Sequence, residues 1–334
     1  MPIRFLKRCA PDPYVLALVL TAALAALFPV RGDAAAALDG AVVVAIGFLF
    51  FLHGARLPGG AVRDGVRHWR LHGAILLSTY ALFPLLGLAC AILVPAVLTE
   101  PLHLGVLFLC VLPSTVQSSI AFTSLAGGNV AAAICAATFS NVLGVLLTPL
   151  LAGLLMAGGS GAVPLDALPR VVLLLLVPFL LGQLARRWIG PRVRGHARAL
   201  GRLDRGVILA VVFTAFSEGT TSGSWQQLTP VRLVLLAVLT AGLLVVVLLV
   251  TTAMAHRFGF SGPDRIALVF AGSKKSLASG LPMASVLFPA AAVGLLVLPL
   301  MLYHQFQLIA CAWLARRFAA ARASAEPDVT PSPT

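Results

Sequence analysis

Two adjacent lysines lie inside an otherwise apolar stretch, FAGSKKSLASG, at residues 270–280. Lys274 and Lys275 are two of only three lysines in the chain, and the other basic residues among the 24 are arginines. A lysine at the bilayer centre costs about 2.5–3.5 kcal/mol on insertion scales, so a lipid-facing pair would offset much of the apolar gain. If the two lysines had no functional role, their side chains would extend to the membrane surface or their segment would be a loop. Their distance from both ends of the stretch favours a protein-lined, hydrated crevice. Because adjacent helical residues point about 100° apart, one lysine can face a substrate cavity and the other a packing partner.

A second polar run follows Pro113 in LPSTVQSSIAFTSLAGG, residues 112–128. Proline removes a backbone donor and crowds the preceding turn, so it interrupts a helix. Gly272, Gly280 and Pro282 are helix-disfavouring residues as well, and they predict an interruption in the lysine stretch. Each interruption begins roughly 13 Å into its apolar segment at 1.5 Å per residue. Two interrupted segments in matching places predict a binding site near the membrane midplane. Its candidate substrate- or ion-binding residues are Ser114, Thr115, Gln117, Ser118, Ser119, Ser273, Lys274, Lys275 and Ser276.

The elements that must position these residues follow from composition. The chain has 334 residues, of which 60% are hydrophobic and 10% charged, whereas soluble domains carry about 25% charged residues. Apolar runs of about 20 residues recur along the chain, which predicts a polytopic α-helical membrane protein. We expect ten spans near residues 14–29, 41–54, 71–95, 104–126, 130–157, 169–185, 206–222, 231–254, 266–288 and 293–315, and the second could begin upstream within 34–37.

The basic residues predict the orientation of these spans. Outside the lysine pair, 19 Arg and Lys residues fall in one set of alternate connections and 3 in the other. The positive-inside rule then places both termini in the cytoplasm. We interpret the arginine-rich stretch 186–205 as a loop that determines topology. The net charge of +13 is spread over these connections, which argues against a nucleic-acid partner, whereas the apolar spans predict contact with the lipid bilayer.

Ten spans divide into two sets of five within one integral membrane unit, residues 1–334. Because five is odd, the second half, 169–315, would enter the membrane upside down relative to the first, 1–157. The fourth and ninth spans, which contain the two interruptions, are equivalent in this arrangement. The Pro-, Ser- and Thr-rich segment 323–334 predicts a disordered cytoplasmic tail.

Other polar residues in the spans are open to two interpretations. Glu218, near the outer end of the seventh span, suits either the membrane surface or a cation site. His304 and Gln305, midway along the tenth, suit an ion pathway, where histidine could take part in proton coupling, or an interhelical hydrogen bond. Thr138 and Asn141 in the fifth span either join helices or bind an ion. The five cysteines are scattered without a metal-binding or disulfide pattern.

Three segments carry a resemblance to a known family: LPSTVQSSIAFTSLAGGNVAAAICAATFSNVLGVLLTPLL (112–151), GSKKSLASGLPMASVLF (272–288) and LPLMLYHQFQLIACAWLA (298–315). They resemble the bile acid:sodium symporter family, and more narrowly its bacterial orphan branch, related to the A7-type vertebrate member. The resemblance implies ten transmembrane helices in two inverted repeats, with discontinuous fourth and ninth helices that cross. It also implies a panel domain of spans one, two, six and seven, and a core domain of spans three to five and eight to ten.

The resemblance implies a sodium site at Ser118, Ser119, Thr138 and Asn141, with no other cofactor. The ninth span departs from the symporters, which place a Glu and a Gln-Asn pair there. This chain has Ala271 or Gly272 and then Lys275-Ser276. One hypothesis is that a lysine ammonium takes the space of one sodium, so that coupling uses fewer sodium ions or uses protons. A buried ammonium can release its proton, since desolvation disfavours its charged form.

These observations predict a secondary active transporter of an organic, anionic small-molecule solute. The sequence contains no Walker motif for a primary pump. It also lacks G-x-S-x-G and H-E-x-x-H motifs, so an intramembrane enzyme is not expected. The alternative is a channel or a non-transporting regulator of ion homeostasis.

Overall fold

The computed structural model describes residues 13–56, 68–156, 169 and 172–325, and the regular elements within these ranges are helices. Each of the ten predicted spans coincides with a helix or a run of helices. The first five are α2 (Pro13–Leu27), α3 (Asp33–Arg56), the run α5 (Trp69–Leu77), η1 (Ser78–Leu82), α6 (Phe83–Ala89) and η2 (Cys90–Leu93), the pair α7 (Glu100–Val111) and α8 (Gln117–Leu125), and α9 (Val130–Leu155).

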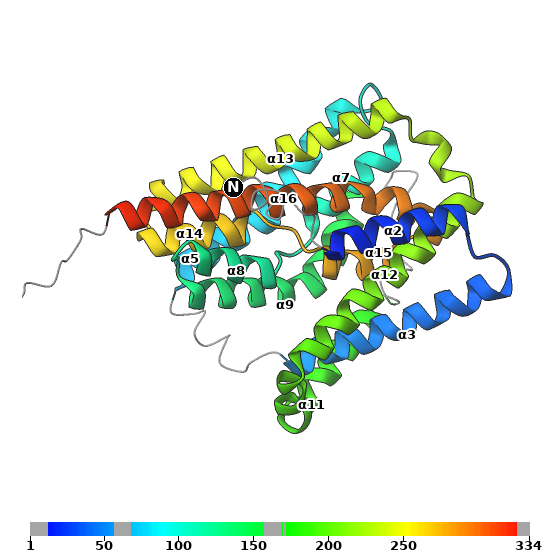
Figure 1. Ribbon diagram of the computed structural model, residues 1–334, viewed down its shortest axis with the longest axis horizontal. Helices are drawn as coiled ribbons and strands as arrows, with labels where there is room; N and C mark the ends of the chain where they lie inside the picture. Colours follow the sequence, from blue (N-terminus) through cyan, green and yellow to red (C-terminus); the bar gives the residue numbers. More distant parts are fainter. Residues whose placement is uncertain (1–12, 57–67, 157–168, 170–171, 326–334) are drawn as a thin grey trace, which may run out of the picture.

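The second half of the chain has the same number of helical segments. They are η3 (Val172–Leu176) with α11 (Val177–Gly195), α12 (Ala197–Thr221), α13 (Pro230–Arg257), the pair α14 (Gly262–Gly272) and α15 (Leu277–Leu287), and α16 (Ala290–Ala325); a short turn, η4 (Ser224–Gln227), follows α12. Figure 1 shows α13 and α16 along the upper edge, with α3 and α11 together below the other helices.

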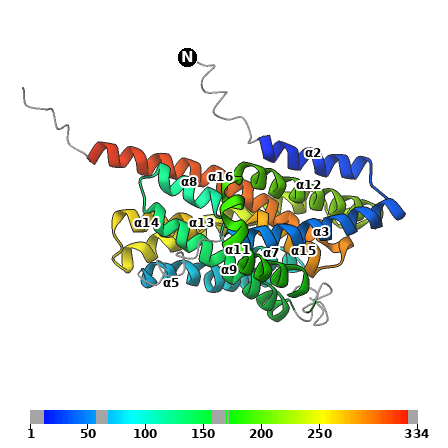
Figure 2. The ribbon, with the colours of Figure 1, turned by 90° about the horizontal axis from the view of Figure 1, so that it is seen from below.

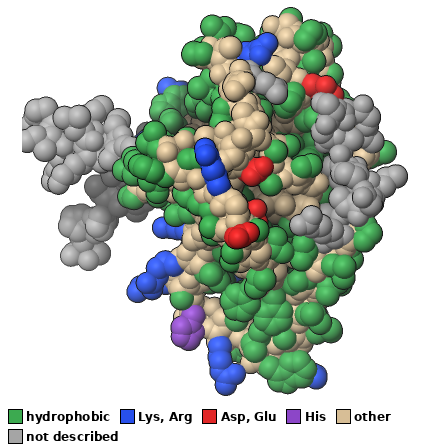
Figure 3. Space-filling model, turned by 90° about the vertical axis from the view of Figure 1, so that its right-hand side faces the viewer, with side chains coloured by type: hydrophobic (Ala, Val, Ile, Leu, Met, Phe, Trp, Pro, Cys, Tyr) green, Lys and Arg blue, Asp and Glu red, His purple; other side chains and the backbone are tan. Residues whose placement is uncertain are grey.

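Six helical runs in the described ranges are long and apolar enough to cross a membrane: Asp33–Arg56, Trp69–Leu93, Val130–Leu155, Val172–Gly195, Pro230–Arg257 and Ala290–Arg322. Large apolar side chains point outward from them, such as Val44, Leu154 and Ile309, each at least 70% exposed. Figure 3 shows hydrophobic side chains over much of one face, with charged side chains few and scattered. Large apolar surface that faces outward needs lipid rather than water around it. The prediction of a polytopic helical membrane protein is confirmed.

Two expectations about helix ends change. The arginine-rich stretch 186–205 is not a loop, because α11 continues to Gly195 and α12 begins at Ala197. Arginine is a strong helix former, so a basic composition marks a polar helix end as readily as a loop. The tail predicted from residue 323 begins later, since α16 continues to Ala325 (Figure 2); residues 326–334 lie outside the described ranges.

The third span contains a π-helical turn, η1, inside an otherwise α-helical run. The amide of Phe83 donates to the carbonyl of Ser78, five residues back, in place of the usual four. A π-turn shifts the phase of the helix and leaves a carbonyl without its usual partner, and such turns often occur at functional sites. The residues of η1 face the two interrupted helices, as the contacts below show.

Helices α3 and α11 pack at very short range through glycines. A Cβ added to Gly54 would collide with the backbone carbonyl of Phe179, and one added to Gly182 would collide with that of Phe51. The side chain of Gln183 donates to the Gly54 carbonyl at 2.8 Å. Small residues that allow backbones to approach are typical of helix pairs in membranes.

Candidate functional site

The fourth and ninth spans are both interrupted, as predicted, and their interruptions touch. Residues outside any helix separate α7 from α8 at 112–116 and α14 from α15 at 273–276. The amide of Ser276 donates to the Pro113 carbonyl at 2.9 Å. The Ser114 hydroxyl donates to the Ala271 carbonyl at 2.6 Å. Each interruption therefore supplies hydrogen-bond partners for the other.

Neutral hydroxyl groups satisfy the last carbonyls of α14. A helix leaves its final four carbonyls without intrahelical partners. Here Ser119 donates to the Phe270 carbonyl at 3.3 Å and Ser78 to the Gly272 carbonyl at 2.8 Å. Tyr303 donates to the carbonyl of Ser273 at 2.7 Å. The end of α14 is thus closed by side chains from three other segments.

An ammonium group satisfies the corresponding end of α7. The Nζ atom of Lys275 donates to the carbonyls of Cys110 and Leu112 at 2.7 Å each, and to that of Thr79 in η1 at 2.9 Å. It also lies 4.0 Å from the centroid of the Phe83 ring. A cation at a helix C-terminus is favoured by the helix dipole. The backbone of Lys275 is fixed by Gln307, whose amide group accepts from its N–H and donates to its carbonyl, both at 2.9 Å.

The neighbouring lysine has a different environment. The Nζ atom of Lys274 lies 4.1 Å from the ring centroid of Phe122 and 5.3 Å from that of Phe270, and it has no hydrogen-bond partner among the described residues. Both lysine side chains are fully buried. The prediction that they are enclosed by protein is confirmed. The expectation that one of them faces a cavity is wrong, because the cavity described next is lined by neither.

Asn141 of α9 connects the two interruptions. Its Nδ2 atom donates to the carbonyls of Ser114 at 2.8 Å and Ala137 at 2.9 Å. Its Oδ1 atom accepts from the hydroxyl of Ser279 at 2.9 Å. Ser279 in turn bonds to Ser276, the N-cap of α15. One amide side chain therefore joins the start of the first interruption to the first turn of α15.

A cavity of about 450 Å³ lies between these interruptions and the helices α3 and α12. Seven of the predicted site residues line it: Thr115, Gln117, Ser118, Thr138, Asn141, Ser276 and His304. Apolar side chains line much of the cavity between its polar groups, among them Phe50, Phe179 and Met283. A lining with both polar and apolar parts suits an amphipathic organic solute.

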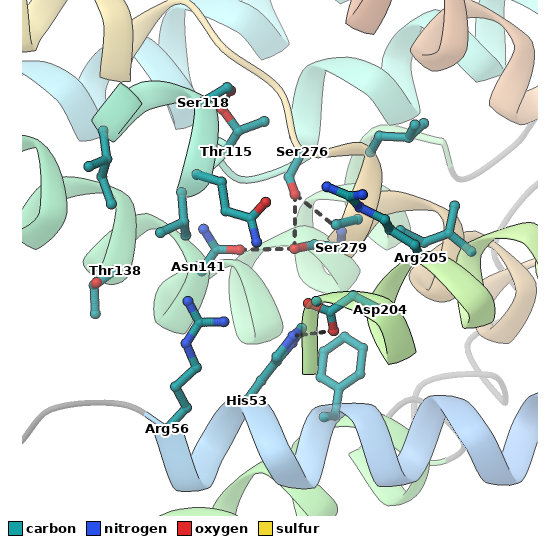
Figure 4. Close-up of a pocket in the computed structure, with 18 of the residues that line it drawn as sticks. His53, Arg56, Thr115, Ser118, Thr138, Asn141, Asp204, Arg205, Ser276 and Ser279 are labelled. Carbon is teal, nitrogen blue, oxygen red and sulfur yellow. Dashed lines mark hydrogen bonds and ion pairs between the residues drawn. The ribbon is translucent and has the colours of Figure 1, made fainter. Parts of the chain in front are cut away.

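Charged residues on the opposite wall were not predicted as site residues. Figure 4 shows His53 and Arg56 extending from α3 toward Asn141, with Asp204 and Arg205 on α12. His53 Nε2 and Asp204 Oδ1 are 3.1 Å apart. The sequence analysis counted both arginines only as determinants of topology. A usable signal was Asp204, the single acid within the basic stretch 186–205, because a lone carboxylate among arginines near a membrane suggests a partner.

The remaining predicted residues do not line the cavity. Ser114, Ser119 and Ser273 are buried in the contact between the interruptions. Glu218 lies three residues before the end of α12, far along that helix from Arg205, and Gln305 is half-buried on α16.

The four residues expected to bind sodium do not surround a single point in this conformation. Ser118 is hydrogen-bonded to Thr115 at 2.7 Å, and Ser119 points to the Phe270 carbonyl. Figure 4 shows Ser118 and Thr138 well apart. All four are neutral, and Asp204 is the carboxylate that lines the cavity among the described residues. Their role as sodium ligands stays a prediction.

Two interrupted helices that meet beside an amphipathic cavity, inside a helical protein with several apolar spans, define a polytopic membrane transporter. The chain belongs to the SBF-like CPA transporter family, whose sequence profile matches residues 12–320. It is 49% identical to "Uncharacterized protein PA2026" of Pseudomonas aeruginosa over 98% of both chains. It is 47% identical to "Putative symporter YfeH" of Escherichia coli over 92% of both chains. It is 29% identical to "Sodium/bile acid cotransporter 7" of Rattus norvegicus, again over 92% of both.

Proposed function

We propose that this protein is a secondary active transporter that carries an organic anion by alternating access. The observation that carries the proposal is the cavity, which places Arg56 and Arg205 opposite the polar groups of the two interruptions. Two guanidinium groups attract an anion into the cavity, and the Asp204 carboxylate lies 3.1 Å from His53. The apolar lining suits the hydrocarbon part of such a solute.

We propose two inverted repeats of five spans, with α7–α8 and α14–α15 as equivalent segments. In this arrangement α2, α3, η3–α11 and α12 form a panel that moves relative to the other helices. Their mutual packing supports this division, since α3 lies along α11 and α12, and α2 lies along α12. The alternation of arginines supports cytoplasmic termini in a bacterial inner membrane. The cavity then opens toward the cytoplasm, because it reaches the last turn of α3 and the first turns of α12.

The coupling ion is part of the same proposal. Two relatives are named as a symporter and as a sodium/bile acid cotransporter, which supports cation coupling. In this chain Lys274 and Lys275 lie where the two interruptions meet. We infer that their fixed positive charge reduces the number of sodium ions needed, or replaces sodium by protons. Thr115, Gln117, Ser118, Asn141, Ser276 and His304 would contact the solute or the coupling ion.

Counterflow in proteoliposomes tests the proposal. The purified protein is reconstituted with unlabelled organic anions inside, beginning with cholate, and uptake of the labelled anion is followed under an imposed sodium or pH gradient. A carrier gives transient accumulation of label against its gradient. Conductive flux without exchange would indicate a channel, and no flux of any anion in a broad panel would indicate a non-transporting regulator; either result would contradict the proposal.

A further inference from the structure

The three carbonyl oxygens around Lys275 Nζ match the three N–H donors of one ammonium group. An ammonium group has three N–H donors, and here each has its own acceptor at 2.7–2.9 Å. The oxygens come from two different spans, at Thr79, Cys110 and Leu112. The ring of Phe83 contacts the cation at 4.0 Å, and aromatic faces attract cations.

These carbonyls depend on the ammonium for partners. α7 ends at Val111, so its final carbonyls have no intrahelical donor. Thr148 donates to the Val111 carbonyl at 2.8 Å, which leaves those of Cys110 and Leu112 to Lys275. Thr79 belongs to the π-turn η1, whose altered hydrogen-bond pattern directs a carbonyl toward the same point. The backbone at two special places, a helix end and a π-turn, therefore builds the site.

The end of α14 shows that an interrupted helix does not always need a cation to satisfy its last carbonyls. There, neutral hydroxyls of Ser78, Ser114 and Ser119 satisfy the carbonyls. Lys274, one residue away from Lys275, has an ammonium without a hydrogen-bond acceptor among the described residues. The two adjacent lysines thus differ in their surroundings, and only the site at Lys275 has the geometry of a cation-binding cage.

We propose that the carbonyls of Thr79, Cys110 and Leu112 form a monovalent-cation site that the protein fills with its own Lys275 ammonium. Shortening this side chain would open the site to a free cation of the ammonium class, such as ethylammonium, and to K⁺, which is similar in size. The consequence for coupling rests on the proposed function, since a tethered cation cannot leave with the solute. The claim that the Lys275 ammonium occupies the site does not depend on the proposed function, and the test below measures no transport.

The test compares thermal unfolding of the purified full-length protein in ethylammonium, potassium and choline chlorides at equal concentration. Lys275→Ala removes the ammonium and leaves space, whereas Lys275→Met removes the ammonium and fills the space. We expect both to unfold about 10 °C or more below the wild type in choline, since each loses three hydrogen bonds to a charged group. Ethylammonium should restore much of the loss in Lys275→Ala and none in Lys275→Met. Lys274→Ala is the matched control and should not respond.

Three results would overturn the proposal: a Lys275→Met protein as stable as the wild type, a Lys275→Ala protein insensitive to every cation, or an equal response in Lys274→Ala. If the Lys275 variants do not fold, the wild type still decides. The chain contains three lysines, so ¹⁵Nζ-lysine labelling gives three resonances by solid-state NMR in lipid. We expect an ammonium signal that is protected from hydrogen exchange and that persists in Lys274→Met. Its absence from the wild type at neutral pH would refute the site.

Discussion

Asn141→Ala should destabilise the protein, because Asn141 holds the two interruptions together. Two of its three hydrogen bonds join different segments, to the Ser114 carbonyl and to the Ser279 hydroxyl. The third bond, to the Ala137 carbonyl, lies within α9 and joins no other segment. Interhelical hydrogen bonds in membrane proteins contribute about 0.6 kcal/mol on average and about 1.7 at most, so the two bonds give a loss of about 1–3 kcal/mol.

Asn141→Asp separates hydrogen bonding from simple loss of volume. The aspartate has nearly the same shape and keeps an acceptor for Ser279, but it presents an oxygen to the Ser114 carbonyl where the amide presented a donor. Repulsion and the burial of a carboxylate then add to the lost bond. We therefore expect Asn141→Asp to be less stable than Asn141→Ala. Thr138→Ala, one turn away on the same cavity wall and without a side-chain hydrogen bond among the described residues, is the control.

The assay is thermal unfolding of the detergent-purified protein, followed by tryptophan fluorescence, because the chain contains four tryptophans. The expected order of unfolding temperature is wild type and Thr138→Ala together, then Asn141→Ala, then Asn141→Asp. If Asn141→Ala unfolds with the wild type, the amide does not connect the interruptions. If Asn141→Asp is as stable as the wild type, the assigned donor and acceptor roles are wrong.

Three further predictions concern packing and the cavity charges. Gly54→Ala should destabilise the contact between α3 and α11 by about 1–3 kcal/mol, measured as a lower unfolding temperature, whereas Gly40→Ala on the same helix meets open space and should not. Arg205→Gln should raise the half-saturating anion concentration in counterflow roughly tenfold, since one cavity charge is lost. Arg257→Gln, outside the cavity lining, should leave this concentration unchanged. Asp204→Asn should strengthen anion binding in that assay, because it removes a negative charge, and weaker binding would show that the carboxylate serves the solute.

Breaker residues made the main features of the fold predictable. Pro113 in the fourth span and Gly272 in the ninth lie at the interruptions that the structure contains. The other two predicted breakers, Gly280 and Pro282, do not interrupt the ninth span, because both lie inside α15. The cost of a lipid-facing charge was enough to predict that Lys274 and Lys275 are enclosed. Their separate environments were not predictable from the sequence. The direction of each side chain in a non-helical segment between two helices depends on the residues that the segment packs against. The cage of Lys275 depends on a carbonyl of η1, and the sequence of that turn, STYAL, contains no glycine or proline to mark it.

The charged residues that line the cavity were not predicted, because the basic residues were assigned to loops and the helices were taken to be shorter than they are. Arg56 and Arg205 satisfy the positive-inside rule as well as any loop arginine, so counting them hides a second role. The structure shows that each lies on a helix within the cavity lining. A residue that follows the positive-inside rule can therefore also line the cavity, and only the helix phase distinguishes the two positions.

The central claim is that the cavity opens alternately to the two sides of the membrane. It is tested most directly by labelling a single cysteine at Thr138, on the cavity wall, in a background without the five native cysteines. A membrane-impermeant thiol reagent is applied to vesicles of each orientation, with counterflow measured in parallel. Alternating access predicts labelling from both sides, slowed by an excess of the transported anion. Labelling from one side only, while exchange of the anion continues, would contradict the claim.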